Sequence, residues 1–274
     1  MSPAVAEWSN LFIRWFHVFV GILWIGSTYF FTWLDGRLHE AEAQGAGGAA
    51  KTGKPQVWMV HSGGFYVVEK RSQPELERRL HWFRWEAALT WLSGMLLLGL
   101  VYYHGGLLVD DSVMDISNRQ ALIIGSLAII IGWPIYDFLM LSPVGKNDYA
   151  AAAIGWLLIT AASYGLAQVF SGRAAYMHIG AILGTIMTAN VWMRILPAQR
   201  NMIAATSAGN APDAALAARA KLRSKHNTFL IWPVVFIMIS NHFPVATYGD
   251  KYNWLILSVL VLVGWGAAKI ARRA

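Results

Sequence analysis

The sequence predicts an all-α integral membrane helix bundle with about seven transmembrane helices and a small β-hairpin in its first cytoplasmic loop. Hydrophobic residues make up 56% of the 274 residues and charged residues only 14%, whereas a soluble domain carries about 25% charged residues. The apolar residues gather in runs of roughly 18 to 24, which is the length that crosses a hydrocarbon core of about 30 Å. Lys and Arg gather in alternate loops between these runs, as in multi-pass proteins.

We expect one membrane domain over residues 1–274, with seven spans. Trp residues open the second span and close the fifth, as is typical of membrane interfaces. Gly and Ala within the runs allow close packing of helices. Pro134 and Pro233 should kink the spans that contain them. The spans are expected at about 11–34, 82–104, 119–141, 150–171, 174–196, 226–243 and 252–271.

Two inner segments have predicted structure of their own. The first, at about 35–81, begins with a Gly/Ala-rich stretch and then has two β-prone runs on either side of Ser62-Gly63-Gly64, a pattern typical of a β-hairpin. The second has Pro212-Asp213 followed by an Ala-rich stretch. It predicts an amphipathic helix over about 212–224 that runs into the sixth span.

The basic residues predict the orientation. They gather after the first span, after the fifth span and in the tail, while the opposite loops hold few of them and one carries Asp110, Asp111 and Asp115. The positive-inside rule therefore places the N-terminus outside and the C-terminus in the cytoplasm. The net charge of +7 is a topology signal, and no nucleic-acid partner is expected.

The sequence contains no cysteine. Disulfides, thiolate metal sites and a covalently attached c-type haem are therefore excluded for this chain. Any redox cofactor must be held by histidine or by non-covalent contacts.

Four histidines on four predicted spans fall at similar depth near the outer side, namely His17, His104, His178 and His242. A b-type haem needs imidazoles from facing helices at its axial positions. We therefore hypothesise a haem b site with His17 and His178 as ligands, where Arg14 and Arg173 can pair with the propionates. A copper or other metal site on the same two histidines is an alternative, and ordinary interface histidines are another.

A second polar set is predicted near the inner side. Carboxylates, an amide, a guanidinium, a phenol and imidazoles at one level are the groups that bind a small polar ligand. The candidate catalytic residues are His226, His61 and Glu86, and the candidate substrate-binding residues are Arg194, Asn190, Asp137 and Tyr66, with Tyr136 nearby. The competing interpretation is a salt-bridge cluster, in which Asp137 or Glu86 neutralises Arg194 or Arg84 within the membrane.

Several stretches of the chain resemble the N-terminal domain of the membrane-bound bacterial urate oxidase (urate hydroxylase) family. They lie at 15–26, 61–66, 189–197, 225–228 and 240–244. The resemblance implies a bacterial inner-membrane protein that oxidises urate to 5-hydroxyisourate and passes electrons to a cytochrome c. Full-length members carry a further cytochrome c domain. The expectation is a short form that uses a separate cytochrome, or a relative that has lost urate chemistry.

The first hypothesis is therefore a urate-oxidising membrane oxidoreductase. Urate would enter at the inner side near the hairpin, with Arg194 and Asn190 as hydrogen-bond donors and with His226 or His61 as proton acceptor. Electrons would leave through the haem towards the outer side. The alternatives are a non-catalytic haem- or copper-binding electron-transfer subunit, and a small-molecule transporter that uses Glu86, Asp137 and Arg194. The sequence lacks the internal repeat that many transporters show.

Overall fold

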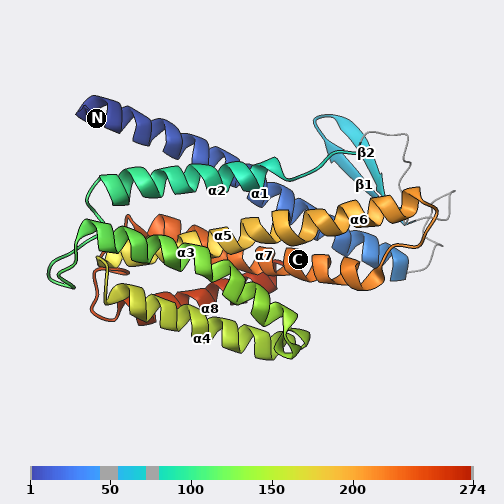
Figure 1. Cartoon of the computed structure of the whole chain (residues 1–274). Helices are drawn as coiled ribbons and strands as arrows, with labels where there is room; N and C mark the ends of the chain where they lie inside the picture. Colours follow the sequence, from blue (N-terminus) through green and yellow to red (C-terminus); the bar gives the residue numbers. More distant parts are fainter. Residues whose placement is uncertain (1, 44–54, 72–79, 273–274) are drawn as a thin grey trace.

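The computed structural model describes residues 2–43, 55–71 and 80–272, which form an antiparallel bundle of seven continuous helices with one β-hairpin (Figure 1). The helices are α1 (Pro3–Ala43), α2 (Trp85–Leu98) continued by η1 (Gly99–His104), α3 (Asn118–Leu141), α4 (Asp148–Ala167), α5 (Gly172–Ala189) continued by η3 (Asn190–Ile195) and α6 (Leu196–Ser207), α7 (Ala214–Ser240) and α8 (Asn253–Ala271). A short 3₁₀ turn, η2 (Pro143–Lys146), joins α3 to α4. The hairpin consists of β1 (Gln56–His61) and β2 (Gly64–Glu69).

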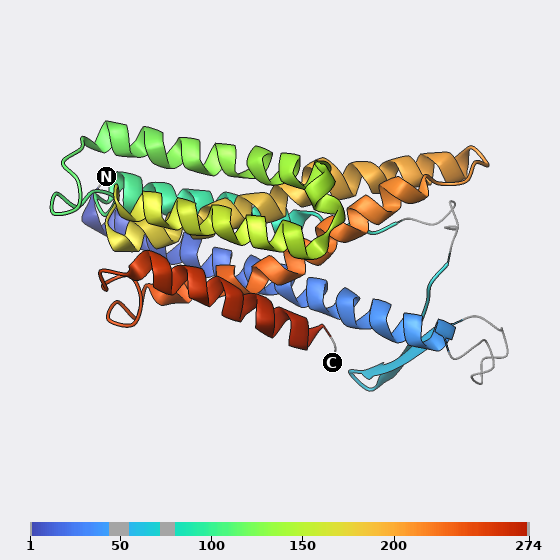
Figure 2. The same ribbon diagram turned by 90° about the horizontal axis from the view of Figure 1, so that it is seen from below.

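The two ends of the bundle differ. The N-terminus and the segment 105–117 lie at one end, here called the loop end, and β1, β2 and the turn between α6 and α7 lie at the other, here called the hairpin end (Figures 1 and 2). The chain runs back and forth between them, so that the C-terminus of α8 points to the hairpin end. The two termini therefore lie towards opposite ends of the bundle.

Six of the continuous helices are long and apolar enough to cross a membrane within the described residues. The six are α1, α2 with η1, α3, α4, α5 with η3 and α6, and α8. These helices support a multi-pass membrane protein. The helix α7 is outside this set because Arg219, Lys221, Arg223 and Lys225 occupy its first half, although α7 packs along α5, η3 and α8.

Each expected span coincides with a helix, but three helices extend further than expected. The helix α1 continues through Ala43 into the expected loop, and α5 continues through η3 and α6 to Ser207. Pro197 does not stop this helix because it lies in the first turn of α6, after the widened π turn, where it is tolerated. The expected amphipathic segment and sixth span are one helix, α7. Residues 44–54 and 72–79 of the expected cytoplasmic loop lie outside the described residues.

The centre of the bundle is α5. Residues 174–181 of α5 are buried without interruption, and the helix packs against α2, α3, α4 and α7. In contrast, 6% of the most apolar window of α1 is buried, compared with 50% for the helix that contains α5. The helix α1 is therefore peripheral and contacts mainly α2.

The structure contains a small two-stranded antiparallel sheet, β1 with β2. Its strands pair antiparallel, from Gln56 opposite Glu69 to His61 opposite Gly64, and Ser62 and Gly63 form the turn with positive φ. Val57 packs against Leu34 and Leu38 of α1. The hairpin is therefore fixed to the end of the first helix.

Glycine allows α7 and α8 to approach closely. A Cβ at Gly264 would lie 3.0 Å from the Cδ and N atoms of Pro233. These atoms belong to a rigid ring and to the backbone, so they cannot move aside as a flexible side chain would. The close approach fixes the packing of these two helices.

We predict that Gly264→Leu lowers the free energy of unfolding in detergent micelles by about 1–3 kcal/mol, because overpacking forces the two backbones apart. Gly266 is the matched control, since a Cβ at Gly266 meets nothing within 4 Å. Denaturant unfolding followed by circular dichroism measures both variants. Equal stability of Gly264→Leu and Gly266→Leu would contradict the close packing.

Candidate functional site

The hairpin-side parts of α3, η3 and α7 bring seven polar side chains together, here called the Asp137 cluster. Its members are Tyr136, Asp137, Asn190, Arg194, Arg223, His226 and Asn227. Three segments that are far apart in the sequence therefore meet at one level. The geometry of this cluster decides what it can bind.

Asp137 is the common partner of two arginines. Its Oδ1 accepts a hydrogen bond from Arg194 Nε at 3.0 Å and another from Arg223 Nη2 at 2.7 Å. Arg194 Nη2 donates to the second carboxylate oxygen, Oδ2. The side chains of Asp137 and Arg223 are only 6% and 5% exposed, whereas Arg194 is 39% exposed. One buried carboxylate thus balances one buried and one half-exposed guanidinium.

A neutral network adjoins this ion pair. The hydroxyl of Tyr136 lies 2.8 Å from Nδ1 of His226 and accepts from Nδ2 of Asn190 at 3.2 Å. Asn190 Nδ2 also lies 3.1 Å from Oδ1 of Asn227, and Asn227 Nδ2 donates to the carbonyl of Met187 at 2.9 Å. The guanidinium of Arg223 covers the Tyr136 ring, with Cζ 4.8 Å from the ring centroid. The network fixes the Nδ1 side of His226.

The π-helical segment η3 supplies two members of the cluster. Asn190 and Arg194 lie at its beginning and near its end. A π-helical turn widens the helix by one residue and is frequent at functional sites. Asn190 is fully buried, so its side chain points into the bundle.

Three buried polar atoms around this cluster have no hydrogen-bond partner in the described part of the chain. They are Oδ1 of Asn190, Nη1 of Arg223 and Nε1 of Trp133, and Arg194 lies over the Trp133 ring with Cζ 5.9 Å from its centroid. Buried polar atoms are almost always paired. One open acceptor and two open donors therefore indicate where a polar ligand or water binds.

The charge of the cluster favours an anion. Asp137 carries one negative charge and Arg194 and Arg223 carry two positive charges, which leaves a net charge of +1 when His226 is neutral. Guanidinium groups form strong, directional hydrogen bonds with planar anions. The arrangement combines properties of both sequence-based interpretations, because it is a salt-bridge cluster with open hydrogen-bonding atoms.

Three predicted site residues lie elsewhere. His61 and Tyr66 are exposed on the hairpin, which packs on α1. Glu86 lies in the first turn of α2 and its side chain makes no ion pair or hydrogen bond within the described residues. The structure therefore does not bring these three side chains into the Asp137 cluster.

At the loop end, His178 is completely enclosed. Its Nδ1 lies 2.8 Å from the carbonyl of Ala174, so that this nitrogen donates, and its Nε2 lies 3.1 Å from the hydroxyl of Tyr103. A Cβ at Gly125 would lie 2.6 Å from Nε2. Both ring nitrogens are occupied and the backbone of α3 covers one of them. His178 offers no nitrogen to a haem iron or metal in this arrangement.

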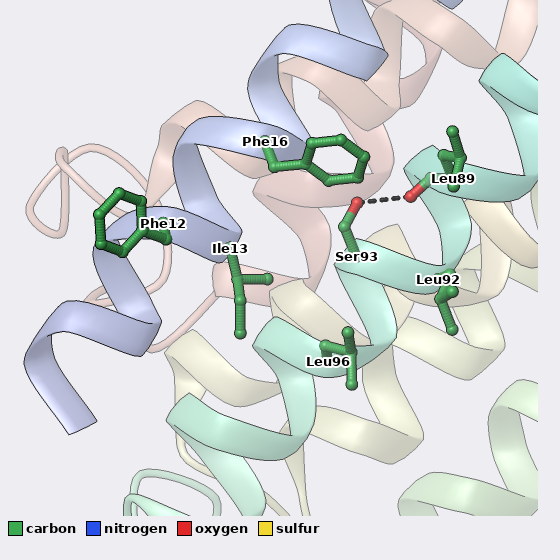
Figure 3. Close-up of a pocket in the computed structure, with 7 residues that line it drawn as sticks. All are labelled: Phe12, Ile13, Phe16, Leu89, Leu92, Ser93 and Leu96. Atoms are coloured by element: carbon green, nitrogen blue, oxygen red, sulfur yellow. Dashed lines mark hydrogen bonds between the residues drawn. The ribbon is translucent and has the colours of Figure 1, made fainter. Parts of the chain in front are cut away.

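His17 has a different environment between α1 and α2. Its Nδ1 lies 3.0 Å from the carbonyl of Thr90 and 3.0 Å from Oγ of Ser93. An apolar groove of about 220 Å³ lies beside it, lined by Phe12, Ile13, Phe16, Leu89, Leu92, Ser93 and Leu96 (Figure 3). Ser93, the polar side chain of this groove, donates to Leu89 O at 2.6 Å.

The two predicted haem ligands have different neighbours. His17 contacts Thr90 and Ser93 of α2, whereas His178 contacts Tyr103 of η1 and Ala174 of α5. Because both nitrogens of His178 are hydrogen-bonded, a haem or metal held between His17 and His178 does not fit this arrangement.

The remaining predicted residues at the loop end do not gather around a cofactor. His104 and His242 are exposed. Arg14 bonds Asn10 Oδ1 at 3.0 Å through Nη2, and Arg173 bonds Asn241 Oδ1 at 2.8 Å through Nε. Among the described residues, no group of three or more His, Cys, Asp or Glu side chains is placed to hold a metal ion.

Sequence reasoning missed Arg223 and Asn227. Arg223 lies about one turn before His226 on α7 and Asn227 directly follows it, and Arg223 is one of the basic residues after the fifth span that predict the orientation. The helical spacing of Arg223, His226 and Asn227 places them on one broad face, which was a signal that could have found them. The residue that this face of α7 binds, Asp137 of α3, could not be found from the spacing within α7.

A family model described as urate oxidase N-terminal matches residues 3–270. The chain belongs to this family. The match covers the hairpin and all described helices, apart from the last residue of α8. The urate oxidase N-terminal region and the membrane bundle are therefore the same unit. Comparison with curated proteins and with solved structures gave no match.

We predict that Asp137→Asn lowers the free energy of unfolding by about 3–5 kcal/mol, because a buried guanidinium loses its counter-charge. Asp148→Asn is the matched control. Asp148 pairs with Lys225 at 2.6 Å on the surface, where such a pair contributes less than about 1 kcal/mol. Denaturant unfolding in detergent measures both. A cost for Asp137→Asn no larger than that for Asp148→Asn would contradict the shared counter-ion.

Proposed function

We propose that this chain is a membrane oxidoreductase that oxidises urate to 5-hydroxyisourate and passes electrons to a cytochrome c. In this reaction the urate anion gains an oxygen atom from water and releases one proton and two electrons, and two ferric cytochromes c accept one electron each. The observation that supports it best is the set of open polar atoms in and beside the Asp137 cluster, in a member of the urate oxidase N-terminal family. These atoms are Asn190 Oδ1, Arg223 Nη1 and Trp133 Nε1.

The open atoms match the edge of a purine. Urate presents ring N–H donors next to carbonyl acceptors and carries a negative charge near neutral pH. Asn190 Oδ1 can accept from a ring N–H, while Arg223 Nη1 and Trp133 Nε1 can donate to carbonyl oxygens. Arg194 already uses Nε and Nη2 on Asp137, so Arg223 is better placed than Arg194 to hold the ligand.

His226 is the proton acceptor of this proposal. In the tautomer that this role needs, Nδ1–H of His226 donates to the hydroxyl oxygen of Tyr136, which also accepts from Nδ2 of Asn190. Nε2 has no hydrogen-bond partner within the described residues and can take a proton from urate or from the attacking water. Tyr136 positions the ring and does not itself touch the substrate.

Haem b remains a prediction for this chain. When bound, a haem would supply one-electron transfer between the substrate and an external cytochrome. The enclosed His178 does not fit the axial position that the sequence predicts, so no step is derived through this group. The same observation gives no support to a non-catalytic haem- or copper-binding subunit on His17 and His178.

The finer topology is also part of the proposal. Seven passes, with α7 as the sixth, place the hairpin end in the cytoplasm of the bacterial inner membrane and the N-terminus outside, as the basic residues predict. The termini at opposite ends of the bundle support an odd number of passes. The Asp137 cluster would then face the cytoplasm, where purines are broken down.

We predict that His226→Asn lowers the turnover of urate by about 10²- to 10⁴-fold and changes the dissociation constant for urate much less. Asparagine can keep the hydrogen bond to Tyr136 but has no Nε2. Turnover is measured with purified protein, urate and ferric cytochrome c, and binding by calorimetry.

His242→Asn is the control for this measurement, because His242 is exposed at the loop end and its replacement should leave turnover unchanged. Unchanged turnover in His226→Asn would remove this residue from the reaction. A wild-type protein that neither binds nor consumes urate would overturn the proposed function itself.

The absence of cysteine allows a direct test of orientation with single cysteines. We predict that Val113→Cys, in the exposed loop before α3, reacts with a membrane-impermeant maleimide in intact spheroplasts. Ser207→Cys, at the end of α6, should react only after the membrane is permeabilised. The reverse pattern would show that the hairpin end lies outside.

A further inference from the structure

One face of the β-hairpin is apolar and open. Trp58 pairs with Val67 and Val60 pairs with Phe65 across the two strands, and side chains of such pairs lie on the same face of a sheet. Trp58, Val60 and Phe65 are 70%, 71% and 81% exposed. These four residues are here called the open face of the hairpin.

The opposite face of the hairpin is covered by α1. Val57, Met59 and Val68 form a small core with Leu34 and Leu38 of α1. The hairpin is therefore apolar on both faces and only one face is covered within the described part of the chain. An isolated two-stranded ribbon of this kind is only marginally stable in water, and a second covered face would stabilise it.

The hairpin lies at the membrane boundary of α1. From Trp15 to Trp33 the exposed side chains of α1 are apolar, and polar residues begin again at Asp35. Leu34 and Leu38, which Val57 contacts, flank this change within about 6 Å along the helix axis. The strands therefore lie at the depth where the hydrocarbon core meets the headgroups.

The hairpin also points towards the membrane. Both views show the hairpin beside the bundle, with the turn between β1 and β2 directed back towards the loop end and outward from the helices (Figures 1 and 2). At its base, Asp35 binds Lys70 at 2.6 Å and Lys221 at 3.1 Å. Two cations share one carboxylate, so the base carries a positive charge that suits a phospholipid surface.

We propose that the open face of the hairpin binds the lipid headgroup interface of the membrane that the helices span, with Trp58 and Phe65 inserted at the boundary of the acyl chains. Aromatic side chains concentrate at this depth in membrane proteins, and an apolar face with basic flanks lies in the interface plane. Phe30 and Trp33 of α1, just before the helix residues that hold the hairpin, are also exposed, by 44% and 40%. This role goes beyond urate oxidation and does not depend on it.

Single cysteines test the proposal in the full-length protein. Val60→Cys places a fluorescent label on the open face, and Ser207→Cys places the same label on the exposed end of α6, at the same end of the bundle. The protein is reconstituted into vesicles of phosphatidylethanolamine and phosphatidylglycerol, with and without a phospholipid that carries a nitroxide. Quenching by the nitroxide lipid and by aqueous iodide is compared.

We expect the nitroxide lipid to quench the label at position 60 several-fold more strongly than the label at position 207, and iodide to show the reverse order. Because Val60 is exposed, Val60→Cys should fold, and gel filtration in detergent confirms this. Equal quenching at the two positions would overturn the proposal. A label at position 60 that is shielded from both quenchers would also overturn it, since a second copy or another protein would then cover the open face.

Discussion

The cluster at the hairpin end depends on one carboxylate shared by two guanidiniums. Asp137 of α3 holds Arg194 of η3 and Arg223 of α7, so three helices are joined where each charge alone would be costly in a membrane. A buried pair of this kind is not retained for stability alone, because well-packed apolar residues would serve as well. The proposed binding role rests on the surplus positive charge and on the open atoms of Asn190 and Arg223.

The helices pack closely around α5. This packing positions the Asp137 cluster at the hairpin end and encloses His178 at the loop end. Where α3 meets α5, Gly125 brings the backbone against Nε2 of His178, the Tyr103 hydroxyl meets the same nitrogen, and the carbonyl of Ala174 occupies Nδ1. The loop-end histidine is thereby a satisfied core residue. At the hairpin end the α-helix widens into η3, and the same helix that is tightly packed at His178 presents Asn190 with an unused acceptor. The open polar atoms on which the proposed site rests lie at the hairpin end of the bundle.

The hairpin and the Asp137 cluster carry similar side chains, so their sequences alone do not show that their surroundings differ. His61 and Tyr66 have the side chains of an active site, yet they are exposed on a hairpin that packs on α1. His226 has the same imidazole, but Tyr136 orients it beside the ion pair. Membership of the urate oxidase N-terminal family applies to both regions, and the difference between them comes from position. The hairpin is better explained as a contact with lipid than as part of the substrate site.

The sequence by itself determined the helices, the hairpin and the level of Asp137, Asn190, Arg194 and His226, because apolar run length, turn residues and depth along a helix are local properties. It could not decide which way each helix turns about its own axis. That rotation, set by close contacts such as Gly125 with His178 and Gly264 with Pro233, paired Arg223 with Asp137 and enclosed His178. Depth alone suggested that His17 and His178 face each other, and only the packing of α2, α3 and α5 showed that each imidazole meets a different neighbour.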